Sequence, residues 1–345
     1  MLRKGRKLTE TIVNQTWPEW GGNLEKRSGG WNNTTYIVSG SSRRAILRIY
    51  DTHRDREKIE FEHAVLLELD KLPLPFATPL PVQTVNGDTL VQLGERDGKF
   101  ACLFRYIEGD SPGDEDTGYY ESFGVAAGLL SSVLAEITPG PQPVYRPYYE
   151  LRQAYPLCTD ETVRELCLNP PEPLAELSEE LNRLYQAYID IADSLKKLET
   201  LPHQLVHGDL NASNLLVDKD DHSRVAALLD FEFCTYDLRA MDPAVILSGL
   251  LGHPEQQRAV RDFCRGFSRS VRLTDDELAA LPTLMLLRKI DVFLHFATRY
   301  MEGTDEGSVL HEQTRLLSAD LIQLSAGTAD MVRILREEQD RANRG

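Results

Sequence analysis

The sequence pattern of the chain changes from mainly strand-like to mainly helical after residue 107. Up to that point it contains short runs rich in β-branched and aromatic residues, such as TTYIVSG, RRAILRIY and KFACLFRYI, and one helical stretch, REKIEFEHAVLLELDKL. Such runs, separated by turn residues, predict a small β-rich unit. The polar stretch 108–118 follows, and most later segments repeat apolar residues at helical spacing. We therefore expect an α+β fold with an N-terminal lobe over residues 1–107 and a mostly helical C-terminal lobe over residues 108–345.

One strand-like segment interrupts the helical part. It reads LVHGDLNASNLLVD and, after a polar turn, RVAALLDFEF. Asp209 follows the strand QLVHG, Asn214 precedes the strand LLV, and Asp230 ends the run VAALL. A strand–loop–strand hairpin brings the loop close to the far end of the second strand. We expect these three polar side chains to converge on one small volume.

Phosphoryl transfer requires a set of this kind. One carboxylate orients the attacking hydroxyl and accepts its proton, and oxygen ligands hold Mg²⁺ against the phosphates of ATP. Asp209 would be this base, and Asn214 and Asp230 the metal ligands. The spacing D-x-x-x-x-N, followed by an apolar strand and DF, matches the protein-kinase signature set in order and role. Taken alone, the Asp, Asn and Ser residues would be ordinary turn residues.

HGDLNASN followed by LLDFE resembles the family of aminoglycoside phosphotransferases, choline kinases and type II homoserine kinases. The resemblance implies a bilobal protein-kinase-like fold, ATP and Mg²⁺ as cofactors, and a hydroxyl of a small molecule as the acceptor. An amino alcohol or amino acid is the expected acceptor, with aminoglycosides and sugars as alternatives. Glu232 stands where protein kinases have the glycine of DFG. We expect Asp242 to brace the catalytic loop and His207 to support it by hydrogen bonding.

The run AILRIY supplies the expected phosphate contact. Alternate side chains of a strand share a face, so Ile46 and Arg48 point the same way. They occupy the positions of the adenine-lining residue and the phosphate-binding lysine in the kinase strand V-A-I-K. Arginine keeps the positive charge and can bind phosphate through two donors. Glu62 on the following helix is the expected carboxylate partner, with Glu57 and Glu60 as alternatives.

Other nucleotide contacts are expected around this strand. The glycines of SGGWNN, Gly29 and Gly30, would let backbone N–H groups approach the phosphates, although the run could be only a hairpin turn. The stretch CLFRYIEG matches the hinge of such kinases, with the adenine floor formed by apolar residues further on. The expected hinge and floor residues are Arg105, Tyr106, Ile107, Leu216 and Leu229.

Charge and composition exclude several classes of partner. The net charge of −16 argues against binding to nucleic acid or to an anionic membrane. The N-terminal run MLRKGRKLTETIV has no apolar core, so we expect no secretory signal and a cytoplasmic location. The apolar segment 281–301 carries several charges and predicts a buried helix instead of a membrane span. The sequence does not indicate an oligomeric state.

A non-catalytic pseudokinase that acts through a partner is the main alternative, motivated by the replaced lysine and the divergent glycine run. The intact Asp209, Asn214 and Asp230 count against it. A protein kinase is less favoured, because RAMDPAV follows DFE too soon for an activation segment. Polar residues on the late apolar helices could line a substrate pocket, although capping and core hydrogen bonding are commoner roles. These weaker candidates are Arg288, His295, Arg299 and Tyr300.

Overall fold

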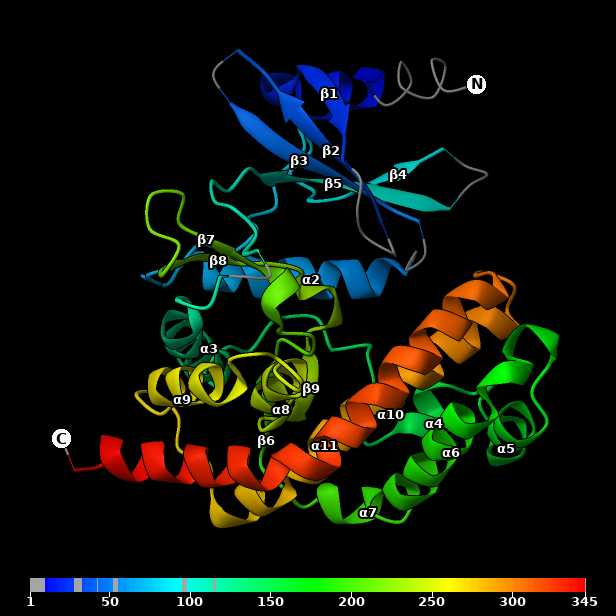
Figure 1. Cartoon of the computed structure of the whole chain (residues 1–345). Helices are drawn as coiled ribbons and strands as arrows, with labels where there is room; N and C mark the ends of the chain where they lie inside the picture. Colours follow the sequence, from blue (N-terminus) through cyan, green and yellow to red (C-terminus); the bar gives the residue numbers. More distant parts are fainter. Residues whose placement is uncertain are drawn as a thin grey trace.

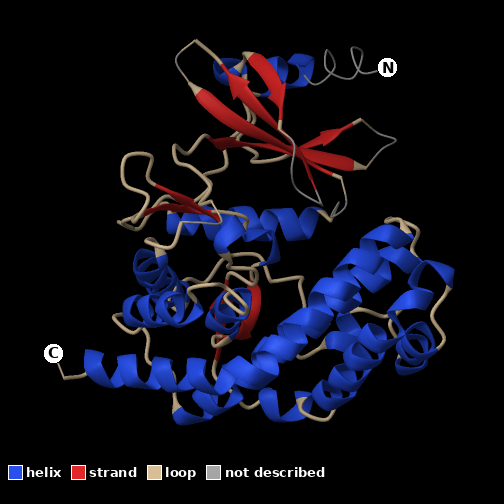
Figure 2. Cartoon of the chain, viewed as in Figure 1, coloured by secondary structure: helices blue, strands red, loops and turns tan. Residues whose placement is uncertain are grey.

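The N-terminal part is an antiparallel sheet of five strands in the order β1-β2-β3-β5-β4 (Figures 1 and 2). The computed structural model describes residues 10–27, 33–41, 43–51, 55–94, 98–113 and 116–344. The short β-branched runs of the sequence form these strands, as predicted. They are β1 (Asn23–Lys26), β2 (Asn33–Ser39), β3 (Arg44–Tyr50), β4 (Val91–Leu93) and β5 (Lys99–Arg105).

The two faces of this sheet belong to different cores. Ala45, Leu47 and Ile49 of β3 pack with Trp17 in a small apolar cluster on one face. On the other face, Tyr50 is buried in the main core, and Ile46 packs against that core while half-buried. Arg48 shares this second face because side chains alternate along a strand. The strand therefore turns Ile46 and Arg48 toward the rest of the molecule, as expected.

The helix α2 (Arg56–Leu69) lies between the sheet and the helical part (Figure 1). Asp55 caps its first turn by accepting a hydrogen bond from the Glu57 backbone N–H at 2.9 Å. The buried residues of α2 include Ile59, Val65 and, unusually for a charged residue, Glu62. The apolar face of the helix thus carries one carboxylate toward β3.

The remainder of the described chain is mostly helical, as expected. Its longest helices, α10 and α11, cross the lower part of the molecule in Figure 1. The predicted buried helix at 281–301 lies within α10, and no helix of the described residues is long and apolar enough to cross a membrane. The helices are α3 (Tyr120–Leu134), α4 (Leu151–Ala154), α5 (Asp160–Leu168), α6 (Ser178–Ala192), α7 (Leu195–Leu198), α8 (Met241–Gly249), α9 (Gln256–Phe267), α10 (Asp275–Met301) and α11 (Gly307–Ala342).

Two strand pairs are embedded in this part, where the sequence predicted a single hairpin. The hairpin of β7 (Leu215–Val217) and β8 (Val225–Leu228) is present. The strand before Asp209, β6 (His203–Val206), pairs instead with β9 (Thr235–Leu238), which the sequence analysis did not assign. The prediction was incomplete because β9 is short and finds its partner about thirty residues upstream, a separation that local patterns do not report.

The connection between the two parts is tied to the hairpin. The Asp110 N–H donates to the Val217 carbonyl at 3.0 Å, and the Val217 N–H donates back to the Asp110 carbonyl at 2.8 Å. The expected lobe boundary at residues 107 and 108 lies between the end of β5 and the start of α3. It stays a prediction, since the connecting segment contacts both parts.

At Gly208 the loop that carries Asp209 packs closely against the segment after Asp230. The φ of Gly208, +84°, is unfavourable for residues with a side chain, and a Cβ there would lie 2.4 Å from the Phe233 carbonyl oxygen. We expect Gly208→Ala to lower the free energy of unfolding by about 2 kcal/mol or more, because both the strain and the clash must be relieved. Urea denaturation would measure the loss.

Gly249, at the end of α8, provides the matched control. A Cβ added there meets nothing within 4 Å. Gly249→Ala should leave the free energy of unfolding unchanged or raise it slightly, because alanine favours the helix. Equal stability of the Gly208→Ala and Gly249→Ala variants would contradict the close approach at Gly208.

Candidate active site

The loop that carries Asp209 is anchored by two buried side chains. The carboxylate of Asp242 accepts hydrogen bonds from the backbone N–H groups of His207 and Gly208, each at 3.0 Å. His207 Nδ1 accepts from the Asp209 N–H at 3.3 Å, which leaves Nε2 to donate to the Leu229 carbonyl at 2.9 Å. Burial raises the pKa of Asp242 above its ordinary value. The expected bracing roles of Asp242 and His207 are therefore seen as hydrogen bonds.

Asp209 and Asn214 contact each other directly. A short 3₁₀ turn over Ala212–Asn214 folds the chain back, and Asn211 caps it by accepting from the Ser213 N–H at 2.9 Å. Asn214 Nδ2 then donates to the Asp209 carbonyl at 2.9 Å and to Asp209 Oδ2 at 3.2 Å. Because the amide nitrogen is held in this way, the oxygen Oδ1 of Asn214 is directed away from Asp209.

Asp230 lies next to Asn214 in a strained backbone conformation. The Leu229 N–H donates to the Asn214 carbonyl at 2.8 Å. Asp230 has φ 64° and ψ 66°, and among the described residues it is the one non-glycine with positive φ. Its Oδ1 is buried and accepts no hydrogen bond from any described group. Strain and an unsatisfied buried oxygen are features of functional sites and of places that bind a cation.

Arg48 reaches from the sheet to both Glu62 and Asp230. Its Nη1 donates to Glu62 Oε1 at 3.1 Å, and its Nη2 lies 3.3 Å from Asp230 Oδ1, close enough for an ion pair but not aligned as a hydrogen bond. Of the three candidate glutamates the structure brings Glu62 to Arg48, while Glu60 pairs with Arg56 on the surface. Each half of the guanidinium thus contacts one carboxylate.

Burial and charge oppose each other at this ion pair. Burial raises the pKa of Glu62 to about 7, although the nearby Arg48 lowers it. For Arg48, burial alone would lower the pKa, but Asp230 and Glu62 outweigh it and hold the pKa above its ordinary value. The guanidinium therefore stays charged, and it needs anionic neighbours to do so.

Arg288 of α10 is the main addition to the predicted site. Its Nη2 donates to Asp209 Oδ1 at 2.5 Å and its Nη1 to the Tyr148 hydroxyl at 2.9 Å. From the sequence, Arg288 was only a weak candidate, and Tyr148 and Asp291 were not predicted as site residues. The available signal was a pair of opposite charges, Arg288 and Asp291, three positions apart on an apolar helix. Arg299 instead pairs with Asp305 and has a structural role.

The predicted hinge residues lie at the end of β5. The N–H groups of Arg105 and Tyr106 donate to the Leu80 and Arg44 carbonyls at 2.9 and 3.2 Å. The Ile107 N–H donates to no group in the described part of the chain, so it is the best placed of the three to meet an adenine edge.

Of the remaining residues predicted to contact the nucleotide, the structure describes the two leucines but not the two glycines. Leu216 and Leu229 are half-buried, and the chain passes so close to Leu216 that a Cβ on Gly109 would lie 2.8 Å from the Leu216 Cβ. Gly29 and Gly30 lie outside the described residues. At the start of β2, Asn33 Nδ2 donates to Glu232 Oε2 at 2.8 Å, so the strand after the glycine run contacts the DFE segment.

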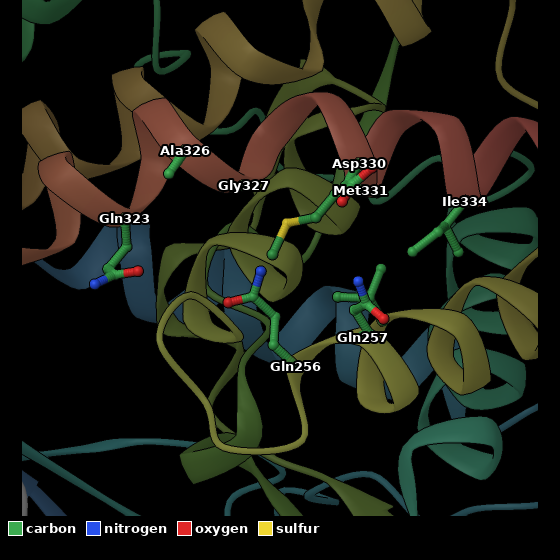
Figure 3. Close-up of a pocket in the computed structure, with 9 residues that line it drawn as sticks. Gln256, Gln257, Gln323, Ala326, Gly327, Asp330, Met331 and Ile334 are labelled. Atoms are coloured by element: carbon green, nitrogen blue, oxygen red, sulfur yellow. The ribbon is translucent and has the colours of Figure 1, made fainter.

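A separate cavity of about 190 Å³ lies between α9 and α11 (Figure 3). Gln256 and Gln257 of α9 face Gln323 and Met331 of α11 across it. It shares no residue with the region around Arg48 and Asp209. We therefore do not count it as part of the candidate site.

The arrangement is suited to phosphoryl transfer. A carboxylate with a solvent-accessible edge, two oxygen donors beside it and a charged guanidinium are the groups that such a reaction uses. They come from β3, the catalytic loop and the end of β8, which the fold brings together.

Sequence comparisons agree with this chemistry. A family model described as phosphotransferase enzyme family matches residues 23–281. The homoserine kinase of Nitrobacter winogradskyi is 24% identical over 263 residues, which cover 74% of this chain and 72% of that protein. The homoserine kinase of Methylobacillus glycogenes is 24% identical over 274 residues, covering 79% and 78%.

Solved structures show that the fold is shared. A microcompartment-associated aminopropanol kinase superposes with a TM-score of 0.66 at 17% identity, covering 96% of this chain and 98% of that chain. The amicoumacin kinase hAmiN, in complex with AMP-PNP, Ca²⁺ and Ami, gives a TM-score of 0.67 at 16% identity, covering 92% and 94%. The expected bilobal kinase-like fold is confirmed.

The pH dependence of unfolding should reveal the buried Glu62 carboxyl. Its pKa is about 7 in the folded chain against 4.5 ordinarily. Between these values the folded state holds a proton that the unfolded state has released, so the free energy of unfolding falls as the pH rises. We expect the contribution of Glu62 to this decline to total about 3 kcal/mol and to be absent in Glu62→Gln, so that the stability of the parent relative to this variant decreases across the interval. Asp237 and Asp291, whose pKa values burial raises to about 7 and about 6, contribute to the decline in both proteins.

Urea denaturation at a series of pH values would measure this difference. Glu60→Gln changes an exposed carboxylate on the same helix and should follow the parent at each pH. A Glu62→Gln variant that keeps the full decline would show that Glu62 does not contribute to it.

Proposed function

The chain belongs to the phosphotransferase enzyme family and is a small-molecule kinase that acts on a hydroxyl group, and we propose that it uses ATP and Mg²⁺ with Asp209 as the base. The observation that supports this most strongly is the contact chain through the site. Arg48 contacts Asp230, the Leu229 N–H binds Asn214, and Asn214 binds Asp209. A phosphate donor and a hydroxyl acceptor would meet along this chain of contacts.

Asp209 would position the acceptor and take its proton. The acceptor oxygen forms a bond to the terminal phosphorus of ATP, the bond from that phosphorus to the bridging oxygen breaks, and ADP leaves. The proton of the hydroxyl passes to the Asp209 carboxylate. Hydrogen bonds from Asn211 and Asn214 hold that carboxylate in one orientation, which supports positioning as a main source of catalysis.

The oxygens of Asn214 and Asp230 fit a hard divalent cation. Asn214 Oδ1 is directed away from Asp209, and Asp230 Oδ1 is buried without a hydrogen-bond donor. Mg²⁺ is usually held by one or two protein oxygens together with substrate phosphates. When bound, the ion would neutralise charge on the phosphates, and Arg48 would bind phosphate oxygens from the side of the sheet.

The acceptor we propose is an amino acid or an amino alcohol. The curated relatives are named homoserine kinases, and one structural neighbour is an aminopropanol kinase. A coupled assay for ADP release against amino acids, amino alcohols, sugars and aminoglycosides would test the proposal. ATP binding without turnover of any of these compounds would favour a non-catalytic pseudokinase.

Asp209→Asn should abolish most of the turnover. Removal of the base is expected to lower kcat by about 10²- to 10⁴-fold, because the acceptor hydroxyl loses its proton acceptor. The affinity for ATP, measured by calorimetry, should stay close to that of the parent. Asp276→Asn removes an exposed carboxylate at the start of α10 and should keep the parent rate. A near-normal rate in Asp209→Asn would exclude the proposed role.

Arg48→Lys should weaken the use of ATP although the charge is kept. A single ammonium group cannot contact Glu62 and Asp230 together as the guanidinium fork does. We expect the KM for ATP to rise about 10-fold in Arg48→Lys and further in Arg48→Met. Titration of ATP at saturating acceptor measures this change. Replacement of the exposed Arg43, just before β3, is the control and should leave the KM for ATP unchanged. An unchanged KM for ATP in both Arg48 variants would contradict the proposed role of Arg48 in phosphate binding.

A further inference from the structure

A second group of charged side chains adjoins Asp209 on the side facing α10. Arg288 contacts Asp209 at 2.5 Å, and its Nη1 lies 3.6 Å from Asp291 Oδ2 on the next turn of the same helix. The side chains of Arg288, Asp209 and Asp291 are 19%, 20% and 15% exposed. All three can therefore be reached by a small molecule whose hydroxyl meets Asp209.

The guanidinium of Arg288 has unused donors. It makes hydrogen bonds to Asp209 and to the Tyr148 hydroxyl, and it makes no others to the described residues. A guanidinium carries five N–H groups, so about three remain after these two bonds. Tyr148 is itself fixed, because its hydroxyl donates to the Gly208 carbonyl at 2.6 Å. The free donors are thus held in a defined place beside the base.

Asp291 is also held in place and is only partly neutralised. Its Oδ1 accepts a hydrogen bond from the Tyr155 hydroxyl at 2.7 Å, while Arg288 is too distant to donate to Oδ2. Burial raises the pKa of Asp291 to about 6, although Arg288 lowers it. An ammonium group beside Oδ2 would stabilise the charged carboxylate.

We propose that Arg288 and Asp291 form a binding site for the head group of an α-amino acid acceptor. Arg288 binds the carboxylate of the acceptor, and Asp291 binds its ammonium group. The side-chain hydroxyl of the same molecule then reaches Asp209. This inference rests on the proposed function and narrows its acceptor to compounds that carry both charges.

The charges favour an amino acid over a simple amino alcohol. An acceptor that has only an ammonium group leaves the spare donors of Arg288 unpaired and places a second cation near the guanidinium, which is unfavourable. An acceptor carboxylate pairs with those donors in the bidentate manner that guanidinium groups favour. It also gives Arg288 a second anion, which weakens its hold on Asp209 Oδ1 and leaves that oxygen available to the hydroxyl.

Three matched acceptors test the assignment in the unmodified protein. Homoserine carries a hydroxyl, an ammonium and a carboxylate group, 3-aminopropan-1-ol lacks the carboxylate, and 4-hydroxybutanoate lacks the ammonium. We expect kcat/KM for homoserine to exceed that for each of the other two by at least about 100-fold, because a buried charged group left unpaired rejects the smaller analogue. Equal or greater kcat/KM for 3-aminopropan-1-ol would overturn the inference.

Variants of Arg288 identify the group responsible. Because Arg288 also contacts Asp209, its replacement affects turnover of every acceptor, and the readout is the ratio of kcat/KM for homoserine to kcat/KM for 3-aminopropan-1-ol. This ratio should fall about 10-fold in Arg288→Lys and about 100-fold or more in Arg288→Met. The ratio between two acceptors measured on one preparation does not depend on how much of the protein is folded. A merely structural Arg288 would lower both values equally, and that result would contradict the proposal. Asp291→Asn should lower kcat/KM more for homoserine and 3-aminopropan-1-ol, which carry an ammonium group, than for 4-hydroxybutanoate, which lacks one.

Lys289→Met is the matched control on α10. Lys289 is the neighbouring cation and pairs with Asp320 of α11 instead of with Asp209. The Lys289→Met variant should keep the ratio of kcat/KM for homoserine to kcat/KM for 3-aminopropan-1-ol that the parent shows. Turnover of amino alcohols with refusal of amino acids would refute this inference and leave the proposed function intact. No turnover of any hydroxyl compound would refute both.

Discussion

The ion pair of Arg48 with two carboxylates is the contact on which the site depends. It joins the sheet to α2 through Glu62 and to the end of β8 through Asp230. Buried charges are costly unless they are paired, so this guanidinium is stable only when strand, helix and loop are assembled together. The part of the site on the sheet, proposed to bind phosphate, and the part around Asp230, proposed to bind the metal, therefore depend on the same ion pair. An arginine in place of the lysine of the protein-kinase strand V-A-I-K suits this arrangement, because each side of its guanidinium group contacts one carboxylate.

Much of the fold could be predicted from the sequence, because local patterns determine it. The alternation in AILRIY correctly placed Ile46 and Arg48 on one face, and the run LLV with VAALL gave the β7–β8 hairpin. The pairing of β6 with β9 depends on residues far apart in the chain, and short strands give little local signal. Glu62 could not be separated from Glu57 and Glu60 without knowing which side of α2 faces β3.

The residues of the candidate site also fall into those that local sequence patterns predict and those that they do not. Asp209, Asn214 and Asp230 could be predicted as site residues because their spacing is short and belongs to one motif. Arg288 is separated from Asp209 by 79 positions in the sequence. The sequence of its own helix does not show whether the guanidinium contacts the loop that carries Asp209, caps a helix or forms an ion pair with a neighbouring helix. Tyr148 and Asp291 were missed for the same reason. Motifs thus predict the chemistry shared by a family, whereas the residues that we propose to bind the acceptor can be identified only from the assembled structure.

The close approach of Gly208 to Phe233 affects how the molecule can move. The catalytic loop and the segment after Asp230 touch through backbone atoms, and Asp242 and His207 fasten the same loop to α8 and β8. Opening of one lobe against the other would therefore not separate Asp209 from Asp230. It would instead change the distance between Arg48 and Asp230, whose contact crosses from the sheet to the hairpin. Asp209, Asn214 and Asp230 would then keep their relative positions, while the distance from Arg48 to this group changes.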